Sequence, residues 1–295
     1  AQGAGARCVY ACIASARARV GAGRGYPRAR DGHLPGAPNR NRGHSERPRW
    51  TRLAGNREKE APVRIERVEA AAPGAADYVR TLELLRAVGR GEHPEVLRLS
   101  RPAPVVAFGR RDELNPGFAR AASSAAAHGF EPWVRKVGGR AAAYHRDCLI
   151  VDHLCPDADA TGGNQRRYRE FGALWARALV DLGVDAGVGE LPGEYCPGEF
   201  SVHGAAGGIG PTKLVGTAQR VVAGAWWFSA AVVVDRREPL AAVLTEVYAA
   251  LGLELDPGTV GAVRQLIPEA RIEDVEDAVL EQYAAWERAA RGGLG

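Results

Sequence analysis

Lysine is almost missing from this sequence of 295 residues. Lys59, Lys136 and Lys213 are the three that occur, and the other 36 basic residues are arginine. A position that stays lysine is therefore a candidate for a role that needs a compact ammonium with a tunable pKa, which a guanidinium cannot supply. Lys136 and Lys213 both lie in segments that contain glycine, and we expect functional residues there. The alternative is that codon or lineage bias removed lysine and left these by chance.

Three further absences narrow the class of protein. The five cysteines are an odd number at irregular spacing, which argues against a disulfide framework and favours a reducing cytoplasm. No CxxC pair and no His/Cys cluster with zinc-ligand spacing occurs, so we expect no metal site. No apolar run reaches the roughly 18 residues of a membrane-spanning helix, so we expect no membrane association.

Positive charge is concentrated at the start of the sequence. Residues 1–60 contain 13 basic and 4 acidic residues, whereas 61–295 contain 26 basic and 31 acidic ones. Residues 1–60 are rich in Gly, Arg, Pro and Asn, and we predict that they are disordered. They would be a solvated tail, a translated stretch upstream of the true start, or an RNA-binding arm. Because 61–295 is mildly acidic, we predict a globular domain there that does not bind nucleic acid.

Hydrophobic periodicity within 61–295 predicts an α+β domain. We expect strands grouped in the middle of the domain and helices at both ends, which indicates a mixed, largely antiparallel central sheet flanked by helices. Residues 239–295 form the helical C-terminal part of this prediction. The expected helices are 75–88, 119–128, 168–182, 239–251, 260–266 and 272–288, and the expected strands are 104–109, 133–137, 148–152, 200–203, 213–218 and 225–234.

The first candidate site is the glycine turn at residues 135–147 (RKVGGRAAAYHRD). Gly138 and Gly139 allow the backbone to approach a ligand closely and to present N–H donors to an anion. Arg135 and Arg140 add positive charge beside these donors. Taken alone, the two glycines are more often a tight turn between two strands, with the basic side chains exposed.

The second candidate site is centred on Cys196, which lies in a Tyr-Cys-Pro-Gly turn that presents a side chain at a loop. If the two strands that flank a loop at 204–211 pair, Lys213 returns to the neighbourhood of Cys196. An ammonium close to a thiol favours the thiolate and activates it as a nucleophile. The alternative is a small apolar residue that fills a turn. Cys148, which begins an apolar strand, and Cys155, which has no basic neighbour, are weaker candidates.

Three motifs in this order resemble the lipoate–protein ligase and octanoyltransferase family, which has the biotin/lipoyl protein ligase catalytic fold. They are RKxGGRA…HxD at 135–147, CPGxxSV at 196–202 and KLxGxAQR at 213–220, within a resemblance over about residues 75–290. The resemblance implies a contact of Lys213 with the acyl carbonyl or phosphate. Lys136 stands where an arginine is common, so Lys213 is the lysine that we expect to matter. The other residues that the resemblance implies for substrate binding are Arg135, Gly138, Gly139, Arg140, His145, Gly216 and Gln219.

The resemblance implies an acyltransferase, with the acyl donor left open. One branch moves an octanoyl or lipoyl group through a cysteine thioester from the glycine-cleavage H protein to a lysine of 2-oxoacid dehydrogenase acyltransferase subunits, and it needs no cofactor. The GGRA segment is similar to a branch that takes the octanoyl group from acyl carrier protein. We expect Cys196 to form the thioester and Lys213 to lower the thiol pKa. The alternatives are a ligase that uses ATP and Mg²⁺ through a lipoyl-adenylate, and a binding protein that holds lipoyl or biotinyl groups without turnover.

Overall fold

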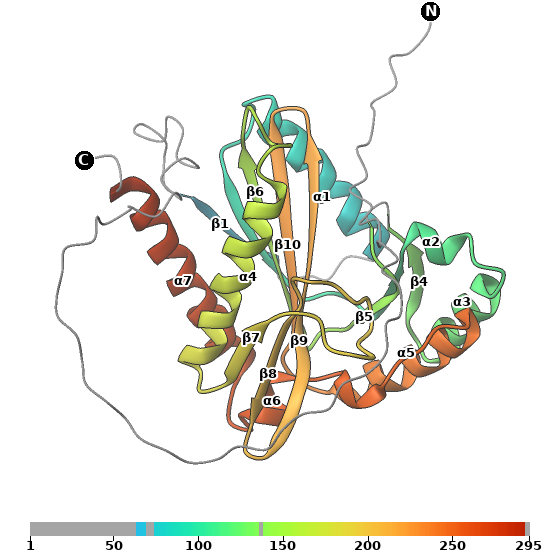
Figure 1. Ribbon diagram of the computed structural model, residues 1–295. Coiled ribbons are helices and arrows are strands. Elements are labelled where there is room, and N and C mark those ends of the chain that lie inside the picture. Colours follow the sequence, from blue (N-terminus) through green and yellow to red (C-terminus); the bar gives the residue numbers. More distant parts are fainter. Residues whose placement is uncertain (1–62, 69–73, 136–137, 293–295) are drawn as a thin grey trace, which may run out of the picture. The chain divides into compact units, whose positions relative to one another are not determined.

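The computed structural model describes residues 63–68, 74–135 and 138–292, which form two β-sheets and the helices around them (Figure 1). The predictions for residues 1–60 and for Lys136 lie outside these ranges. The predicted α+β class is confirmed, because the helices lie against sheets in which antiparallel pairing dominates.

The larger sheet has seven strands in the order β1-β2-β6-β10-β9-β8-β7. Only β1 and β2 run parallel to each other, and every other neighbouring pair in this sheet is antiparallel. The sheet is therefore mixed and largely antiparallel, as predicted. Its strands are β1 (Arg64–Val68), β2 (Val96–Ser100), β6 (Cys148–Pro156), β7 (Asp185–Val188), β8 (Val202–Ala206), β9 (Ile209–Val222) and β10 (Ala225–Val233).

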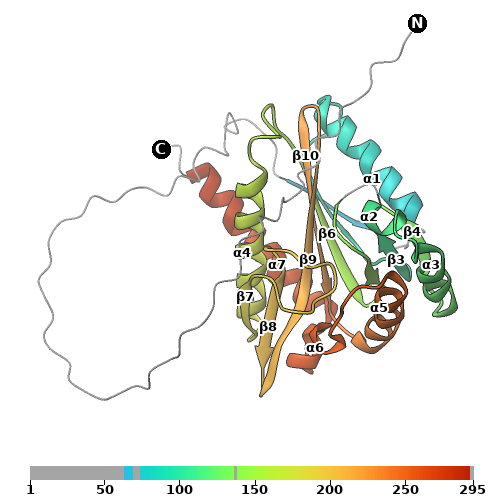
Figure 2. The ribbon, with the colours of Figure 1, turned by 45° about the vertical axis from the view of Figure 1, so that its right-hand side comes forward.

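Different helices cover the two faces of the larger sheet (Figure 2). Helices α4 (Asn164–Asp181) and α7 (Ile272–Gly292) lie together on one face, where Phe171 and Trp175 are fully buried in the largest hydrophobic cluster. Helix α1 (Gly74–Gly89) packs on the other face against a smaller cluster. No helix in the part of the chain that the structure describes combines the length and the apolar character needed to cross a membrane.

The smaller sheet has three strands in the order β4-β3-β5 and lies beside a pair of helices. Helices α3 and α5 pack on each other and share a hydrophobic cluster with β3 and β5. The elements of this part are β3 (Val105–Phe108), α2 (Arg110–Glu113), α3 (Phe118–Ala127), β4 (Glu131–Val134), β5 (Ala142–Tyr144) and α5 (Arg237–Leu251). After α5 the chain forms the 3₁₀ turn η3 (Pro257–Thr259) and the short helix α6 (Val263–Leu266), which lead to α7.

Four strands of the structure, β1, β2, β5 and β7, were not predicted, and the last three were missed for identifiable reasons. β2 is buried throughout but contains Arg98, which interrupts its apolar pattern. β5 is Ala-Ala-Tyr and β7 is Asp-Ala-Gly-Val, and both are poor in the β-branched and aromatic residues that favour strands. Because β5 follows the glycine turn, that turn does not join the predicted strands 133–137 and 148–152 directly. Those two segments contribute to different sheets.

The predicted antiparallel pair around Lys213 is formed by β8 and β9, but the loop prediction for 204–211 is wrong. Ala206 pairs with Ile209, so only Gly207 and Gly208 lie between the strands. Both glycines have positive φ angles, +57° and +82°, which is the conformation of the two-residue hairpin turns that match strand twist. The remaining residues of the expected loop belong to the strands.

A buried arginine ties α1 to the larger sheet. Arg98 of β2 is 2% exposed, and its guanidinium donates to Asp77 (3.0 Å) and Thr81 (3.2 Å) of α1. The same group faces Asp152 of β6 at 3.4 Å, and Trp227 donates its indole N–H to the other oxygen of Asp152 at 2.9 Å. Arg98 is thus shared by two carboxylates, and burial still raises the pKa of Asp152.

We expect Arg98→Ala to lower the free energy of unfolding by about 3–5 kcal/mol, because it leaves the buried Asp152 without its counter-charge. Arg101→Ala is the matched control three residues along the chain. Arg101 pairs with Glu273 on the surface, and the loss there should be about 1 kcal/mol or less. Urea denaturation of both variants tests the difference, and equally small losses would contradict it.

Candidate active site

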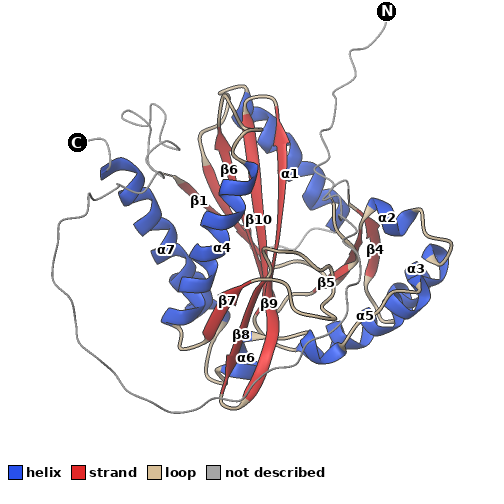
Figure 3. Ribbon diagram, in the orientation of Figure 1, coloured by secondary structure: helices blue, strands red, loops and turns tan. Residues whose placement is uncertain are grey.

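Cys196 lies in the long connection from β7 to β8, which runs toward β5 and α5 (Figure 3). Its φ angle is +42°, and Arg236 is the only other non-glycine residue in the described ranges with a positive φ. The left-handed region costs a residue with a Cβ about 1–2 kcal/mol. The next residue is Pro197, and a residue before proline favours an extended conformation instead. The surrounding structure must therefore hold Cys196 in place.

Two side chains from distant elements bind the backbone of Cys196 at its two polar groups. The Cys196 N–H donates to the hydroxyl of Tyr248 in α5 at 2.6 Å. The ammonium of Lys213 in β9 donates to the carbonyl oxygen of Cys196 at 2.9 Å and to that of Tyr195 at 2.8 Å. Both polar groups of this left-handed residue are satisfied, which stabilises the turn that carries the thiol.

The Cys196 sulfur accepts hydrogen bonds from the glycine turn. Arg135 Nη2 lies 3.4 Å from Sγ, and the backbone N–H of Arg140 lies 3.3 Å from it. Burial by itself raises the pKa of Cys196, but the charges of Arg135 and Lys213 and the Arg140 N–H outweigh it and lower the pKa below its usual value. A lowered pKa supplies the thiolate, which is the nucleophilic form.

The other two cysteines in the described ranges are unlike Cys196. Cys148 and Cys155 are buried, whereas Cys196 is partly exposed. Burial raises the pKa of Cys148 to about 12, so that thiol stays protonated at neutral pH. Among these three thiols, Cys196 alone combines access with an environment that favours the thiolate.

Gly139 is required by the close approach of the two motifs. Its φ angle is +99°, and a Cβ at this position would lie 2.8 Å from both Cys196 Sγ and Arg135 Nη2. Any side chain would therefore push the thiol away from its donors. At Gly138 an added Cβ would meet no atom within 4 Å, so this glycine borders open space. Only the second glycine of the pair is fixed by packing.

Arg135 and Arg140 have different partners. The Arg140 guanidinium pairs with the fully buried Asp112 at 3.1 Å, and Asp112 also accepts the N–H of Gly109 at 2.9 Å. Arg135 donates to the carbonyl oxygen of Arg140 at 2.7 Å and to Cys196. No carboxylate in the described ranges forms an ion pair with Arg135, and the group beside it that can carry a negative charge is the Cys196 thiol.

Lys213 returns to Cys196, but its ammonium contacts carbonyl oxygens and not the thiol. Besides the carbonyls of residues 195 and 196, it lies 3.3 Å from a carboxylate oxygen of the buried Glu194. The same oxygen accepts hydrogen bonds from Ser201 Oγ at 2.6 Å and from the Gly198 N–H at 3.0 Å. The cation that contacts the sulfur is Arg135, and Lys213 acts on the thiol pKa from further away.

His145 stabilises the turn between β5 and β6. Its Nδ1 accepts the N–H of Asp147 at 3.1 Å, so the hydrogen of the neutral ring is on Nε2, which faces the carbonyl oxygen of Arg236 at 2.9 Å. Within the described ranges its hydrogen bonds do not reach Cys196. The expectation that His145 lines the acyl pocket therefore has no support from these contacts.

Gln219 and Gly216 lie on β9 beyond Lys213. The Gln219 side chain accepts from Arg167 Nε at 2.8 Å and donates to the Asn164 carbonyl at 2.9 Å, which ties β9 to the start of α4. At Gly216 an added Cβ would meet only Lys213 Cε, at 3.9 Å. Both residues remain predictions as substrate contacts.

Sequence reasoning missed three residues of the site. Asp112 had a local signal, because Gly109-x-x-Asp112 matches the pattern in which an acid caps a helix N-terminus. Glu194 adjoins the Tyr-Cys-Pro-Gly turn but carried no distinguishing spacing. Tyr248 lies 52 residues from Cys196 on an ordinary amphipathic helix, and no local pattern identifies it.

Two other features of the described residues, a cluster of potential metal ligands and a surface hollow, lie apart from Cys196. Glu95, His153 and Cys155 bring potential metal ligands within 4.8 Å of one another. However, His153 Nε2 and Glu95 Oε1 are 2.7 Å apart, a hydrogen-bond distance and shorter than the about 3.3 Å between two ligands of a tetrahedral zinc. We interpret this pair as a buried hydrogen bond.

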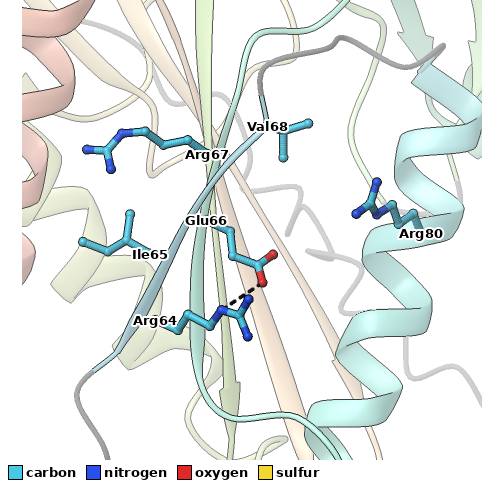
Figure 4. A pocket seen from close by; sticks show the side chains of 6 residues that line it. All are labelled: Arg64, Ile65, Glu66, Arg67, Val68 and Arg80. Atoms are coloured by element: carbon cyan, nitrogen blue, oxygen red, sulfur yellow. Dashed lines mark ion pairs between the residues drawn. The ribbon is translucent and has the colours of Figure 1, made fainter.

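The second feature is a hollow along the edge strand β1, in which Arg64 pairs with Glu66 at 3.3 Å (Figure 4). It contains no nucleophile and shares no residue with the Cys196 cluster. The residues that line it are Arg64, Ile65, Glu66, Arg67, Val68 and Arg80.

Solved structures with this fold include lipoate ligases. The crystal structure of lipoate-protein ligase A bound with ATP is 20% identical, with a TM-score of 0.55 over 76% of this chain and 84% of that one. Ta0514, a putative lipoate protein ligase from T. acidophilum with bound lipoic acid, is 18% identical, with a TM-score of 0.55 over 76% of this chain and 85% of that one. At these identities the similarity establishes the fold alone.

Residues 80–284 match the family model of the lipoyl protein ligase A/B catalytic domain, and the chain belongs to this family. The resemblance inferred from the three motifs is thereby confirmed. An octanoyl-[GcvH]:protein N-octanoyltransferase of Geobacillus kaustophilus (strain HTA426) is 30% identical over 141 residues, which are 48% of either chain. The enzyme of the same name from Anoxybacillus flavithermus (strain DSM 21510 / WK1) is 29% identical over 141 residues, or 48% of this chain and 49% of that one. The chain spans about half the length of these curated relatives.

We expect Arg135→Gln to raise the pKa of the Cys196 thiol, because the variant removes the cation that contacts the sulfur. The rate of alkylation by iodoacetamide follows the thiolate fraction, so its midpoint should move to higher pH. Arg146, which is exposed just before β6 begins, supplies the control. Arg146→Gln removes the same charge and should leave the midpoint of Cys196 alkylation unchanged. Coincident pH profiles for the wild type and Arg135→Gln would contradict this assignment.

The positive φ of Cys196 predicts an unusual order of stability for two variants that both lack the thiol. At an ordinary loop position Gly is less stable than Ala by about 0.4–1 kcal/mol, because it is more flexible when unfolded. At residue 196 Ala keeps the left-handed penalty of about 1–2 kcal/mol, so Cys196→Gly should equal or exceed Cys196→Ala in stability. Glu199, exposed in the same loop, supplies the control pair with the ordinary order. Urea denaturation of Cys196→Gly, Cys196→Ala, Glu199→Gly and Glu199→Ala measures the four free energies of unfolding. A Cys196→Gly variant that is less stable than Cys196→Ala would contradict backbone strain at residue 196.

Proposed function

We propose that this chain is an acyltransferase that moves an octanoyl or lipoyl group onto a lysine of a lipoyl-domain protein through a thioester on Cys196. The observation that carries the proposal is the partly exposed Cys196 thiol, which accepts hydrogen bonds from Arg135 and from the Arg140 N–H and has a lowered pKa. The activity named for the relatives from Geobacillus and Anoxybacillus supports the same chemistry.

In the first half of the proposed reaction, the Cys196 thiolate attacks the acyl carbonyl of the donor. A carbon–sulfur bond forms, and the bond from the acyl carbon to the donor's lysine nitrogen breaks, with the departing amine taking up a proton. The negative charge moves from the sulfur to the carbonyl oxygen as the bond forms. The N–H groups of Arg135 and Arg140 that face the sulfur are then well placed to stabilise that oxygen.

In the second half, a lysine amine of the acceptor attacks the thioester, gives up a proton and releases the Cys196 thiolate. One acyl–nitrogen bond is broken and one is formed over the cycle, and the proton taken up is returned. The exchange therefore requires no ATP. Arg135, which has no carboxylate partner in the described ranges, stabilises the thiolate both as the resting form and as the leaving group.

In the ATP-dependent alternative Lys213 would bind a phosphate. The surroundings of the Lys213 ammonium do not fit that role. An ammonium has three N–H donors, and three protein acceptors already face this one: the carbonyls of Tyr195 and Cys196 and the carboxylate of Glu194. Lys213 is also 1% exposed, and the negative charge of Glu194 would repel a phosphate beside it. The proposed reaction therefore has no step that involves ATP or Mg²⁺.

We propose the glycine-cleavage H protein as the acyl donor and 2-oxoacid dehydrogenase acyltransferase subunits as acceptors. The name of the relatives supports the donor, because it describes transfer from octanoylated GcvH to protein. Acyl carrier protein is the other donor to be tested, since it carries its acyl group as a thioester that the same thiolate could attack.

Incubation with octanoylated H protein and no ATP should give an enzyme adduct of octanoyl mass that hydroxylamine removes, because thioesters are cleaved by that reagent. Cys196→Ala should give no adduct, whereas Cys155→Ala, which alters a buried cysteine, should still give it. Intact-mass spectrometry measures all three proteins, and octanoylated acyl carrier protein is run in parallel.

Other results would reject the proposal in distinct ways. Transfer that requires ATP and free lipoate and persists in Cys196→Ala would establish the ligase reaction. Tight binding of lipoyl or biotinyl groups without any transfer would indicate a binding protein.

A further inference from the structure

We infer that Tyr248 is a positioning residue for the Cys196 thiolate: its hydroxyl joins the turn that carries the thiol to the glycine turn that carries the thiol's hydrogen-bond donors. The consequence for acyl transfer rests on the proposed function. The consequence for thiol reactivity does not, and the two can be measured separately.

The Tyr248 hydroxyl has two backbone partners from different parts of the chain. It accepts the Cys196 N–H at 2.6 Å and lies 3.0 Å from the carbonyl oxygen of Ala141. A phenol has one hydrogen, and a carbonyl oxygen can only accept, so the hydroxyl must donate to Ala141. Burial raises the pKa of Tyr248, which is 2% exposed, so the phenol keeps the hydrogen that this bridge needs.

The bridge ends next to the donors of the thiol. Ala141 directly follows Arg140, whose backbone N–H contacts Sγ and whose carbonyl oxygen accepts from Arg135. The carbonyl of Ala141 and the amide of Cys196 are thus fixed to the same oxygen atom. This fixes the separation between the sulfur and its two donors, which is the geometry that lowers the thiol pKa.

The inferred role requires the hydroxyl and not the ring. The ring of Tyr248 packs in the hydrophobic cluster shared by α3, α5, β3 and β5, and phenylalanine would keep that packing. Without the hydroxyl, the Cys196 N–H loses its acceptor, and a left-handed residue before proline loses one of its two backbone contacts. Relaxation of φ toward the extended region would carry the sulfur away from Arg140.

The test compares Tyr248→Phe with Tyr283→Phe in the whole chain of 295 residues. Tyr283 is the matched control, because it is also buried and its hydroxyl has no hydrogen-bond partner in the described residues. Alkylation of Cys196 by iodoacetamide is followed against pH by mass spectrometry. We expect Tyr248→Phe to move the midpoint upward by about one pH unit, a roughly tenfold lower thiolate fraction at neutral pH. Tyr283→Phe should match the wild type.

Acyl transfer from octanoylated H protein is measured on the same proteins. A nucleophile displaced by about 1 Å loses on the order of a hundredfold in rate, so kcat of Tyr248→Phe should fall by that order while KM for the acceptor stays close to the wild-type value. A shifted alkylation profile in Tyr248→Phe combined with no transfer by the wild type would uphold the positioning role and reject the proposed function.

An alkylation profile of Tyr248→Phe that coincides with the wild-type profile would overturn the inference. If that variant does not fold, hydrogen exchange on the unaltered protein gives the answer. The Cys196 amide should exchange slowly because it donates to a buried hydroxyl. Exchange of that amide at the rate of an unstructured peptide would also overturn the inference.

Discussion

The site depends on one backbone conformation, the positive φ of Cys196. A residue with a Cβ does not adopt this conformation before a proline unless other groups hold it there. Here the N–H is bound by Tyr248 from α5 and the carbonyl oxygen by Lys213 from β9. The outcome is a sulfur that faces the backbone N–H of Arg140, which is possible only because Gly139 has no side chain to occupy the space between them. Residues from three other parts of the chain, in α5, β9 and the glycine turn, thus contact the Cys196 turn.

Charge balance at the site follows a simple pattern. Lys213 is neutralised by Glu194, and the side chain of Arg140 is neutralised by Asp112. Arg135 is buried, and no carboxylate among the described residues pairs with it, so ionisation of the Cys196 thiol would compensate its charge. A buried unpaired cation is costly, and ionisation of the neighbouring thiol removes that cost. The fold therefore favours the thiolate without a histidine base, in agreement with the structural role of His145 at the β5–β6 turn.

The parts of the site that the sequence predicts are those with local signals. Gly139, Cys196 and Lys213 stood out through turn chemistry and the scarcity of lysine, and the pairing of β8 with β9 explains how the last two meet. Tyr248 could not be found in this way, because its contact depends on how α5 packs beside β5. The same limit applies to the fold: α4 has a clear apolar face, whereas β2 was hidden by Arg98, whose burial makes sense only once Asp77 and Asp152 face it.

The geometry around Lys213 also explains why lysine persists there in a chain that otherwise uses arginine. Its three acceptors, two carbonyl oxygens and one carboxylate oxygen, lie within 2.8 to 3.3 Å of a single nitrogen atom. An ammonium directs three donors from one point, whereas a guanidinium spreads its donors over a planar fork. Lys213 is 1% exposed and its nitrogen lies 4.7 Å from the centre of the Tyr195 ring, so the larger, planar guanidinium would have to displace neighbouring groups. The scarce residue is thus retained for its shape: a compact cation that fixes the two consecutive carbonyls at the Cys196 turn.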